Sequence, residues 1–170
     1  EQIRLAYCVH AVNHVLKTRT KILNNNAKHE ARDSGEEKLR DQGFTRPKVL
    51  IIVPFKEAAR RVVECIISLL HPHDKGNVSN RKRFNQDYAK IVTARKDKSE
   101  DYYNTFEGNI DDSFKLGLAV TKKTLKLYTD FYSSDIIISS PLGLRLVTGV
   151  EGQEEDEEEG RRTEGDTDFL

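Results

Sequence analysis

Two short, uninterrupted apolar runs restrict the fold of this chain more than any other feature of its sequence. Residues 49–53 and 136–138 are entirely aliphatic, mostly β-branched, and each is followed within a few residues by proline. Such runs predict strands that are covered on both faces of a parallel sheet. Residues 57–70 between them carry apolar side chains at helical spacing. Strand, helix and strand in this order predict an α/β fold with a parallel sheet and flanking helices.

The rest of the chain divides into segments of different character. Residues 1–46 begin with apolar side chains at helical spacing, which predict an amphipathic helix followed by a polar loop. Residues 81–92 have a helical pattern, and 142–147 look like the start of another helix, whereas 114–120 and 125–128 mix both periods and stay unassigned. Residues 151–168 are predicted to be a disordered acidic insertion or linker. Cys8 and Cys65, far apart within helical patterns, are predicted to be reduced thiols.

Charge is distributed unevenly along the chain. Ten of the 28 acidic residues, but only two of the 28 basic residues, lie in 151–168, so the remainder is basic. A basic body is consistent with a nucleic-acid partner and also with ordinary solvated surface charge. No apolar run is long enough to suggest a membrane span.

Sequence motifs for catalysis or metal binding were sought and not found. The chain has no G-x-x-x-x-G-K-[ST] string for binding nucleotide phosphates, and no acidic residue ends an apolar strand. His10 and His14 share a helix face, yet no third ligand is evident. The pair Asp111 and Asp112 is predicted to cap a helix before Phe114. We therefore expect no catalytic residues, no metal and no cofactor within this sequence.

The residues that follow the two strands are the best candidates for a binding site. Ligands of open α/β sheets bind beyond the carboxyl ends of the strands, and helix N-termini there attract phosphate. Proline, serine and glycine at these positions are also ordinary turn and cap residues, so both interpretations remain open. The candidate RNA-binding residues are Pro54, Phe55, Lys56, Ser140, Pro141, Gly143 and Arg145.

Two family resemblances bear on these loops. Residues 46–58 resemble the strand and P-T-R-E-L-A loop of DEAD-box RNA helicases, and residues 134–143 resemble their later T-P-G-R element. Four longer strings, at residues 10–17, 40–50, 108–112 and 130–138, resemble the digestive organ expansion factor (Def) family.

The Def resemblance carries expectations about fold and function. It implies that residues 47–150 form a RecA-like, helicase-type half-domain that has lost its ATPase motifs. It also implies a nucleolar component of the small-subunit processome. Its partners would be pre-ribosomal RNA, the small nucleolar RNA particle and other processome proteins, and it would support maturation of the small-subunit RNA.

Two alternatives remain open beside this pseudo-helicase interpretation. The first is an active RNA-dependent ATPase whose nucleotide motifs lie outside these residues. The second is a pure protein-interaction module whose surface is buried by partners. RNA-stimulated ATP hydrolysis would indicate the first, and crosslinks to protein without crosslinks to RNA would indicate the second.

Overall fold

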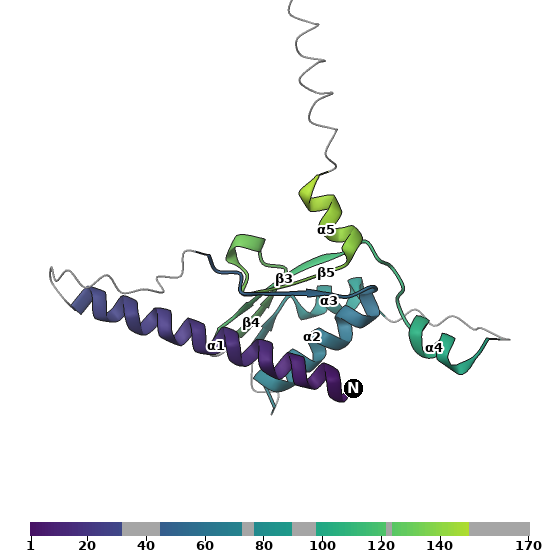
Figure 1. Cartoon of the computed structure of the whole chain (residues 1–170), viewed down its shortest axis with the longest axis horizontal. Helices are drawn as coiled ribbons and strands as arrows, with labels where there is room; N and C mark the ends of the chain where they lie inside the picture. The colour runs from purple at the N-terminus through teal and green to yellow at the C-terminus, as the bar shows by residue number, and fades with distance from the viewer. Residues whose placement is uncertain (32–44, 73–76, 90–97, 122–123, 150–170) are drawn as a thin grey trace, which may run out of the picture.

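A computed structural model of the chain describes residues 1–31, 45–72, 77–89, 98–121 and 124–149 (Figure 1). The acidic segment 151–168 and residues 90–92 lie outside this described part, and the helix predicted over 81–92 ends earlier, at Asp87. The elements are α1 (Gln2–Ala31), β1 (Val49–Ile52), α2 (Lys56–Leu70), β2 (Asn77–Ser79), α3 (Arg81–Asp87), α4 (Glu100–Phe106), β3 (Lys115–Val120), β4 (Thr124–Leu127), η1 (Phe131–Ser133), β5 (Ile136–Ser139) and α5 (Pro141–Thr148).

The five described strands form one sheet in the order β1-β5-β3-β4-β2. β1 and β5 are parallel, as are β2 and β4, but β3 is antiparallel to both of its neighbours. The α/β class is therefore confirmed, whereas the purely parallel sheet predicted from the sequence is wrong. The short connection between β3 and β4 explains the difference, because parallel neighbours need a crossover of a dozen or more residues.

The first predicted strand is present as β1, but it is not covered on both faces. Val49 and Ile51 pack against the hydrophobic core, as their pairing with Ile136 and Ile138 requires. Leu50 and Ile52 point to the opposite face and are 52% and 54% exposed. Burial on β1 alternates because this strand lies at the end of the sheet and the described chain covers one of its faces.

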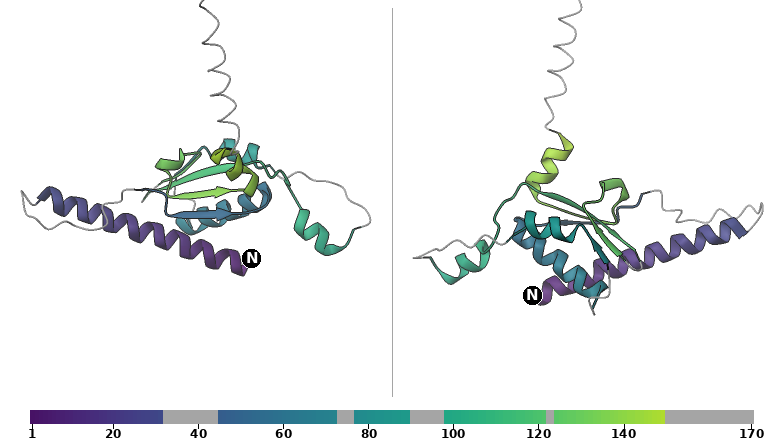
Figure 2. Two further views of the ribbon diagram at one scale, coloured as in Figure 1. Left: turned by 45° about the horizontal axis from the view of Figure 1, so that its top comes forward. Right: turned by 180° about the vertical axis from the view of Figure 1, so that it is seen from behind.

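The core lies between the sheet and two helices. α2 buries Ala59, Val62, Val63, Ile66 and Ile67 against the inward side chains of β3 and β5, at the spacing expected for one face of a helix. In both views of Figure 2, α1 and α2 lie on one side of the sheet, while α5 projects from the other side.

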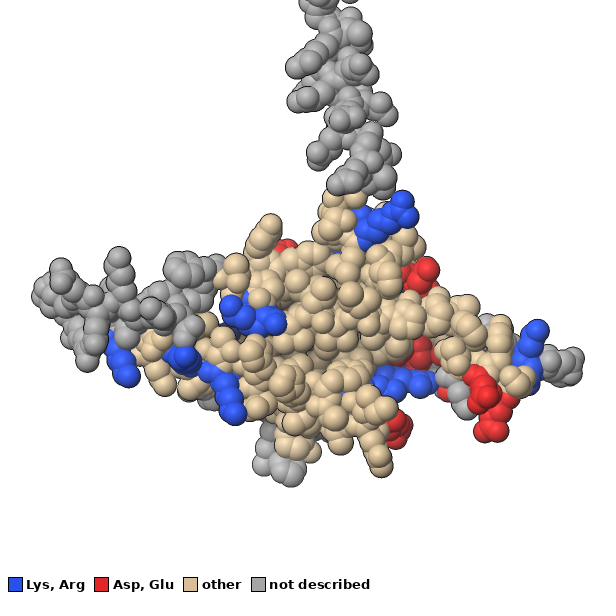
Figure 3. All heavy atoms as spheres, viewed as in Figure 1, with Lys and Arg blue, Asp and Glu red and all other residues tan. Residues whose placement is uncertain are grey.

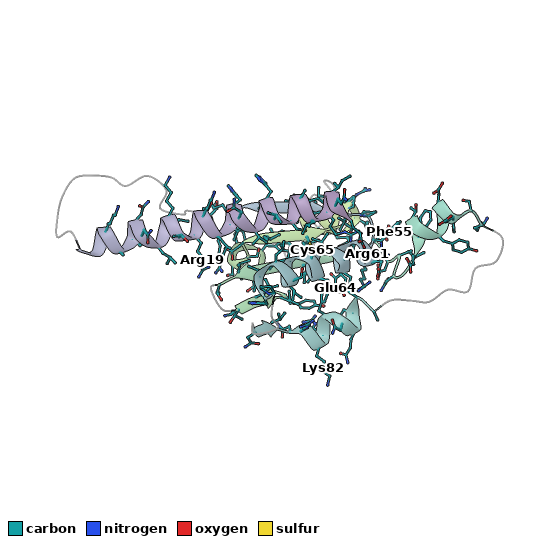
Figure 4. The ribbon with its side chains drawn as sticks, turned by 90° about the horizontal axis from the view of Figure 1, so that it is seen from below. Arg19, Phe55, Arg61, Glu64, Cys65 and Lys82 are labelled. Carbon is teal, nitrogen blue, oxygen red and sulfur yellow. The ribbon has the colours of Figure 1, made fainter. Side chains whose placement is uncertain are left out.

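The interface between α1 and α2 contains the two cysteines. Cys8 is fully buried within this core, and its thiol interacts with that of Cys65. Cys65 lies on the side of α2 that faces α1 (Figure 4). Both thiols are free, as predicted.

Two further sequence predictions are settled by the elements around the sheet. The helix expected near residues 142–147 is present as α5, which begins one residue earlier at Pro141. No helix follows the aspartate pair 111–112, because buried Phe114 leads directly into β3. The predicted helix cap at that pair is therefore wrong. None of the described helices is both long enough and apolar enough to cross a membrane.

Candidate nucleic-acid interface

The loops that follow β1 and β5 lie next to each other because the two strands are parallel neighbours. Their carboxyl ends are joined by a hydrogen bond of 3.1 Å from the Val53 N–H to the Ser139 carbonyl oxygen. Lys56, at the start of α2, and Gly143, in the first turn of α5, line one open cavity of about 340 Å³. The structure thus brings together the two loops that the sequence singled out.

Pro54 and Phe55 do not belong to this cavity. They line a separate pocket of about 240 Å³ together with Arg61 and Glu107. The Phe55 ring packs against the ring of Phe106 in α4, with 5.7 Å between the centroids. Figure 4 shows Phe55 at the end of α2 that faces α4. Phe55 therefore fixes α4 to the body, and only its neighbour Lys56 points into the cavity.

Backbone N–H groups at the two helix starts are already paired within the chain. The N–H groups of Lys56 and Glu57 donate to the carbonyl oxygens of Asp111 and Asn109, both at 2.9 Å. The Gly143 N–H donates to the buried Ser140 Oγ at 2.8 Å. Ser140 is therefore a helix cap that shapes its loop from within. These pairings support the turn-and-cap interpretation for the backbone and leave ligand contacts to the side chains.

Gly143 allows α5 to lie very close to the backbone of Phe114, the residue just before β3. A Cβ atom at this position would lie 2.0 Å from the Phe114 carbonyl oxygen, which belongs to the backbone and cannot swing away. The same oxygen accepts hydrogen bonds from Ser139 Oγ at 3.0 Å and from the Ser140 N–H at 3.2 Å. Gly143 is needed for this close approach, and it places α5 at the rim of the cavity.

Lys56 is held in place by an ion pair. Its Nζ donates to Asp111 Oδ2 at 2.7 Å, and the two side chains are 19% and 45% exposed. The ammonium of Lys56 and the backbone N–H of Ser113 hold the pKa of Asp111 below its usual range. Lys56 Nζ also lies 5.8 Å from the centroid of the Tyr88 ring. This cation therefore has a fixed position and a competing internal anion.

Glu57 anchors the loop that carries Asp111. Its side chain is 5% exposed and accepts hydrogen bonds from Arg60 at 2.7 and 2.9 Å and from Arg61 at 2.8 Å. Burial would raise the pKa of Glu57, but the two guanidinium groups outweigh it, and the pKa is lowered. Gly108, at a φ of +87°, passes directly over this carboxylate, and a Cβ there would lie 2.7 Å from it. The buried carboxylate and the loop thus fit against each other.

The opposite wall of the cavity is aromatic and was not predicted from the sequence. Tyr128 has a φ of +59°, which is rare for a bulky side chain. Its hydroxyl donates to Asp87 Oδ2 at 2.7 Å, and the Arg83 guanidinium lies 4.2 Å from the ring centroid. Burial, followed by the Asp87 carboxylate, raises the pKa of Tyr128. The ring is therefore held rigidly, in a backbone conformation that costs energy.

One further exposed cation lines the cavity, and another lies on α5 outside its lining. Lys115, the first residue of β3, lines the cavity itself. Arg145 is exposed in the last turn of α5, and Pro141 is exposed at its start. Lys115 was missed because residues 114–128 carried no clear periodicity. The cavity offers one fixed cation, one exposed cation and an aromatic wall, which suit binding of a phosphate backbone and an unpaired base.

The described residues offer no metal site, and the basic residues at the start of α3 do not line the cavity. Within the residues that the structure describes, no group of three or more His, Cys, Asp or Glu side chains could hold a metal ion. Arg81, Lys82 and Arg83 form a basic cluster at the start of α3, and Lys82 points away from the body (Figure 4). Its Arg83 pairs with Asp87 at 3.3 Å.

Comparison with known proteins places this sequence in a family. The U3 small nucleolar RNA-associated protein 25 homologs of Xenopus tropicalis and Homo sapiens are 50% and 48% identical to the chain over 159 and 161 residues. The U3 small nucleolar RNA-associated protein 25 of Botryotinia fuckeliana is 48% identical over 153 residues. These matches cover 90%, 90% and 89% of the chain but 21% of each relative, so the chain spans about a fifth of their length.

No solved structure matches the chain. The family description that matches residues 1–170 reads "UTP25, NTP hydrolase-like domain". That match extends over the whole sequence, including the two loops and the cavity between them. The chain belongs to the UTP25 family.

Proposed function

We propose that this chain is the RNA-binding, helicase-like part of a small-subunit processome component that acts in the nucleolus during ribosome biogenesis. Relatives that share about half of its residues are named for association with the U3 small nucleolar RNA. The proposal includes a RecA-like fold, pre-ribosomal RNA and other processome proteins as partners, and no ATPase activity of its own. The observation that carries it is the convergence of both strand-end loops on one cavity lined by cations and aromatic rings.

In this proposal the three cations contact RNA phosphates and Tyr128 contacts a base. Lys56 and Lys115 both line the cavity, and Arg145 is exposed on α5, the helix whose Gly143 and Leu146 line it. Contacts to phosphate position a strand without reading its sequence, whereas aromatic faces stack on any unpaired base. The site is therefore expected to bind single-stranded RNA with little sequence preference and strong dependence on salt.

The test compares RNA binding by the full-length protein and single variants over a range of salt concentrations. Lys56→Gln, Lys115→Gln and Arg145→Gln should each weaken binding and lower the slope of log affinity against log salt by about 0.7, the value expected for one phosphate contact to a single strand. Lys17→Gln is the matched control, because this exposed lysine lies on α1 and does not line the cavity. Unchanged affinity and slope in all three variants would reject the site.

A second comparison uses the ion pair between Lys56 and Asp111 and predicts an increase in RNA affinity instead of a loss. Asp111→Asn removes the anion that competes for Lys56, so RNA binding should tighten. Asp111 is nearly half exposed, and an ion pair of this kind is worth up to about 1 kcal/mol, which corresponds to roughly fivefold in affinity. Asp112→Asn removes the same charge from the next residue, which is exposed and does not line the cavity. Equal effects of the two variants would show that only net charge matters.

The enzymatic alternative needs its own assay, because the matching family description contains the words NTP hydrolase-like. ATP turnover by the full-length protein should stay at background with and without RNA. Stimulation of hydrolysis by RNA would overturn the non-enzymatic part of the proposal. It would leave the RNA site to be judged by the variants above.

A further inference from the structure

β1 is the last strand at its end of the described sheet, and one of its edges is unpaired. The N–H groups of Val49 and Val53 donate to β5 and its flanking residues, at 3.3 and 3.1 Å. Backbone groups alternate in direction along a parallel strand, so those of Leu50 and Ile52 point away from β5. These two residues therefore present backbone donors and acceptors at a free edge.

The edge also borders an apolar groove. A groove of about 670 Å³ runs between β1 and α1, and its wall on α1 is formed by Tyr7, His10, Ala11 and His14. The half-exposed side chains of Leu50 and Ile52 lie along it. Figure 3 shows that the middle of this face, where β1 runs in Figure 1, is mostly uncharged.

The residues of β1 lack the charges, proline and bulges that keep free strand edges from pairing. Proteins protect such edges with inward-pointing charges, proline, bulges or a covering helix. β1 is Val-Leu-Ile-Ile with no charge, no proline and an unbroken register against β5. Leu50 and Ile52 are aliphatic where a protected edge would carry lysine. The strand has the chemistry of a paired strand inside a sheet.

We propose that a further apolar β-strand of the same protein, from outside residues 1–170, pairs with the free edge of β1 and fills the groove. The length of the relatives supports this occupant, because the chain spans about a fifth of each and most of their polypeptide lies outside the matched region. An apolar strand would supply partners for the edge backbone groups and cover for the exposed apolar side chains. Its backbone pairs with the groups of Leu50 and Ile52, and the element that carries it covers their side chains.

The first test is hydrogen exchange at residue resolution in the full-length protein. The amides of Leu50 and Ile52 should exchange as slowly as the amide of Ile51, which points into the sheet. A free edge would make these two amides exchange at least about 100-fold faster than that of Ile51, because an exposed amide needs no cooperative opening. Fast exchange at both positions would overturn the proposal.

The second test identifies the occupant. A photoreactive amino acid in place of Ile52 in the full-length protein should give a crosslink within the same polypeptide, to an apolar segment outside residues 1–170. Tyr132 is the control position, because it is 92% exposed on η1 and does not line the groove. A crosslink to a second copy, to another protein or to RNA would overturn the proposal, as would no crosslink above the control.

Discussion

Replacing Glu57 with alanine should destabilise the protein far more than replacing Glu64, which also pairs with Arg60. Glu57 accepts three hydrogen bonds of 2.7 to 2.9 Å from Arg60 and Arg61, and its side chain is 5% exposed. Removing one partner of a buried ion pair costs roughly 3–5 kcal/mol. Arg60 and Arg61 remain 24% and 31% exposed, so water partly solvates them afterwards. The expected cost is therefore at the lower end, about 3 kcal/mol.

Glu64→Ala is the matched control. Glu64 also pairs with Arg60, but its side chain is 53% exposed. An exposed pair of this kind contributes about 0.5 kcal/mol or less. Both variants remove a carboxylate from Arg60, and they differ in burial and in a second arginine, Arg61, which Glu57 also binds.

Urea unfolding of the protein followed by circular dichroism measures both variants, because urea does not screen ion pairs as guanidinium chloride does. With a slope of about 2 kcal/mol per molar urea, a loss of 3 kcal/mol moves the midpoint down by about 1.5 M. Glu64→Ala should move it by less than about 0.3 M. Equal shifts would refute the argument that burial makes this carboxylate important.

The pH dependence provides an independent check of the same carboxylate. Its pKa in the folded protein is below the ordinary value of 4.5. Its contribution to stability is therefore present above pH 4.5 and is lost as pH falls through the lower, folded pKa. The wild-type protein should lose stability over this acidic range, and Glu57→Ala should lose less. Parallel pH profiles would contradict the assignment.

Three further predictions concern the fold around the site. Gly143→Ala should destabilise the protein by about 2 kcal/mol, since the new Cβ overlaps the Phe114 carbonyl oxygen, and a native urea midpoint would contradict this contact. Asp135→Ala should cost about 3 kcal/mol in the same assay, because buried Asp135 accepts hydrogen bonds from Arg46 at 3.0 and 3.1 Å and from the Val120 N–H at 2.6 Å. Burial, reinforced by Cys65, raises the pKa of Cys8 to about 12, so iodoacetamide at pH 7 should label Cys8 in the native protein only on unfolding, as mass spectrometry would show.

The sequence predicted the elements whose periodicity reflects a single environment. β5 and α2 each have an unambiguous apolar pattern, and both are present. β3 could not be assigned, because its buried face carries leucines and valine while its other face carries Gly117 and Ala119, which are also buried. Gly117 is buried because the Thr129 carbonyl oxygen lies where a side chain would be. That contact is tertiary, and nothing in the local sequence indicates it.

The site shows a similar division between local and tertiary information. The sequence singled out the two strand ends separately, and the parallel pairing of β1 with β5 brings the loops near Lys56 and Gly143 together. Phe55 was grouped with Lys56, yet Phe55 is an extended N-cap residue and Lys56 is the first helical residue, so the two side chains point to different pockets. Tyr128 was missed because its positive φ and its contacts with α3 depend on how distant segments pack.

Residues 55–57 link the stability of the fold to the position of the Lys56 ammonium group. Phe55 holds α4, Lys56 reaches the cavity, and Glu57 is buried beneath the loop that carries Asp111. The backbone N–H groups of Lys56 and Glu57 donate to that same loop. The position of the Lys56 ammonium therefore depends on a carboxylate that no ligand can touch. An RNA phosphate that binds Lys56 must displace Asp111 alone, because the buried Glu57 network remains intact and keeps the loop in place.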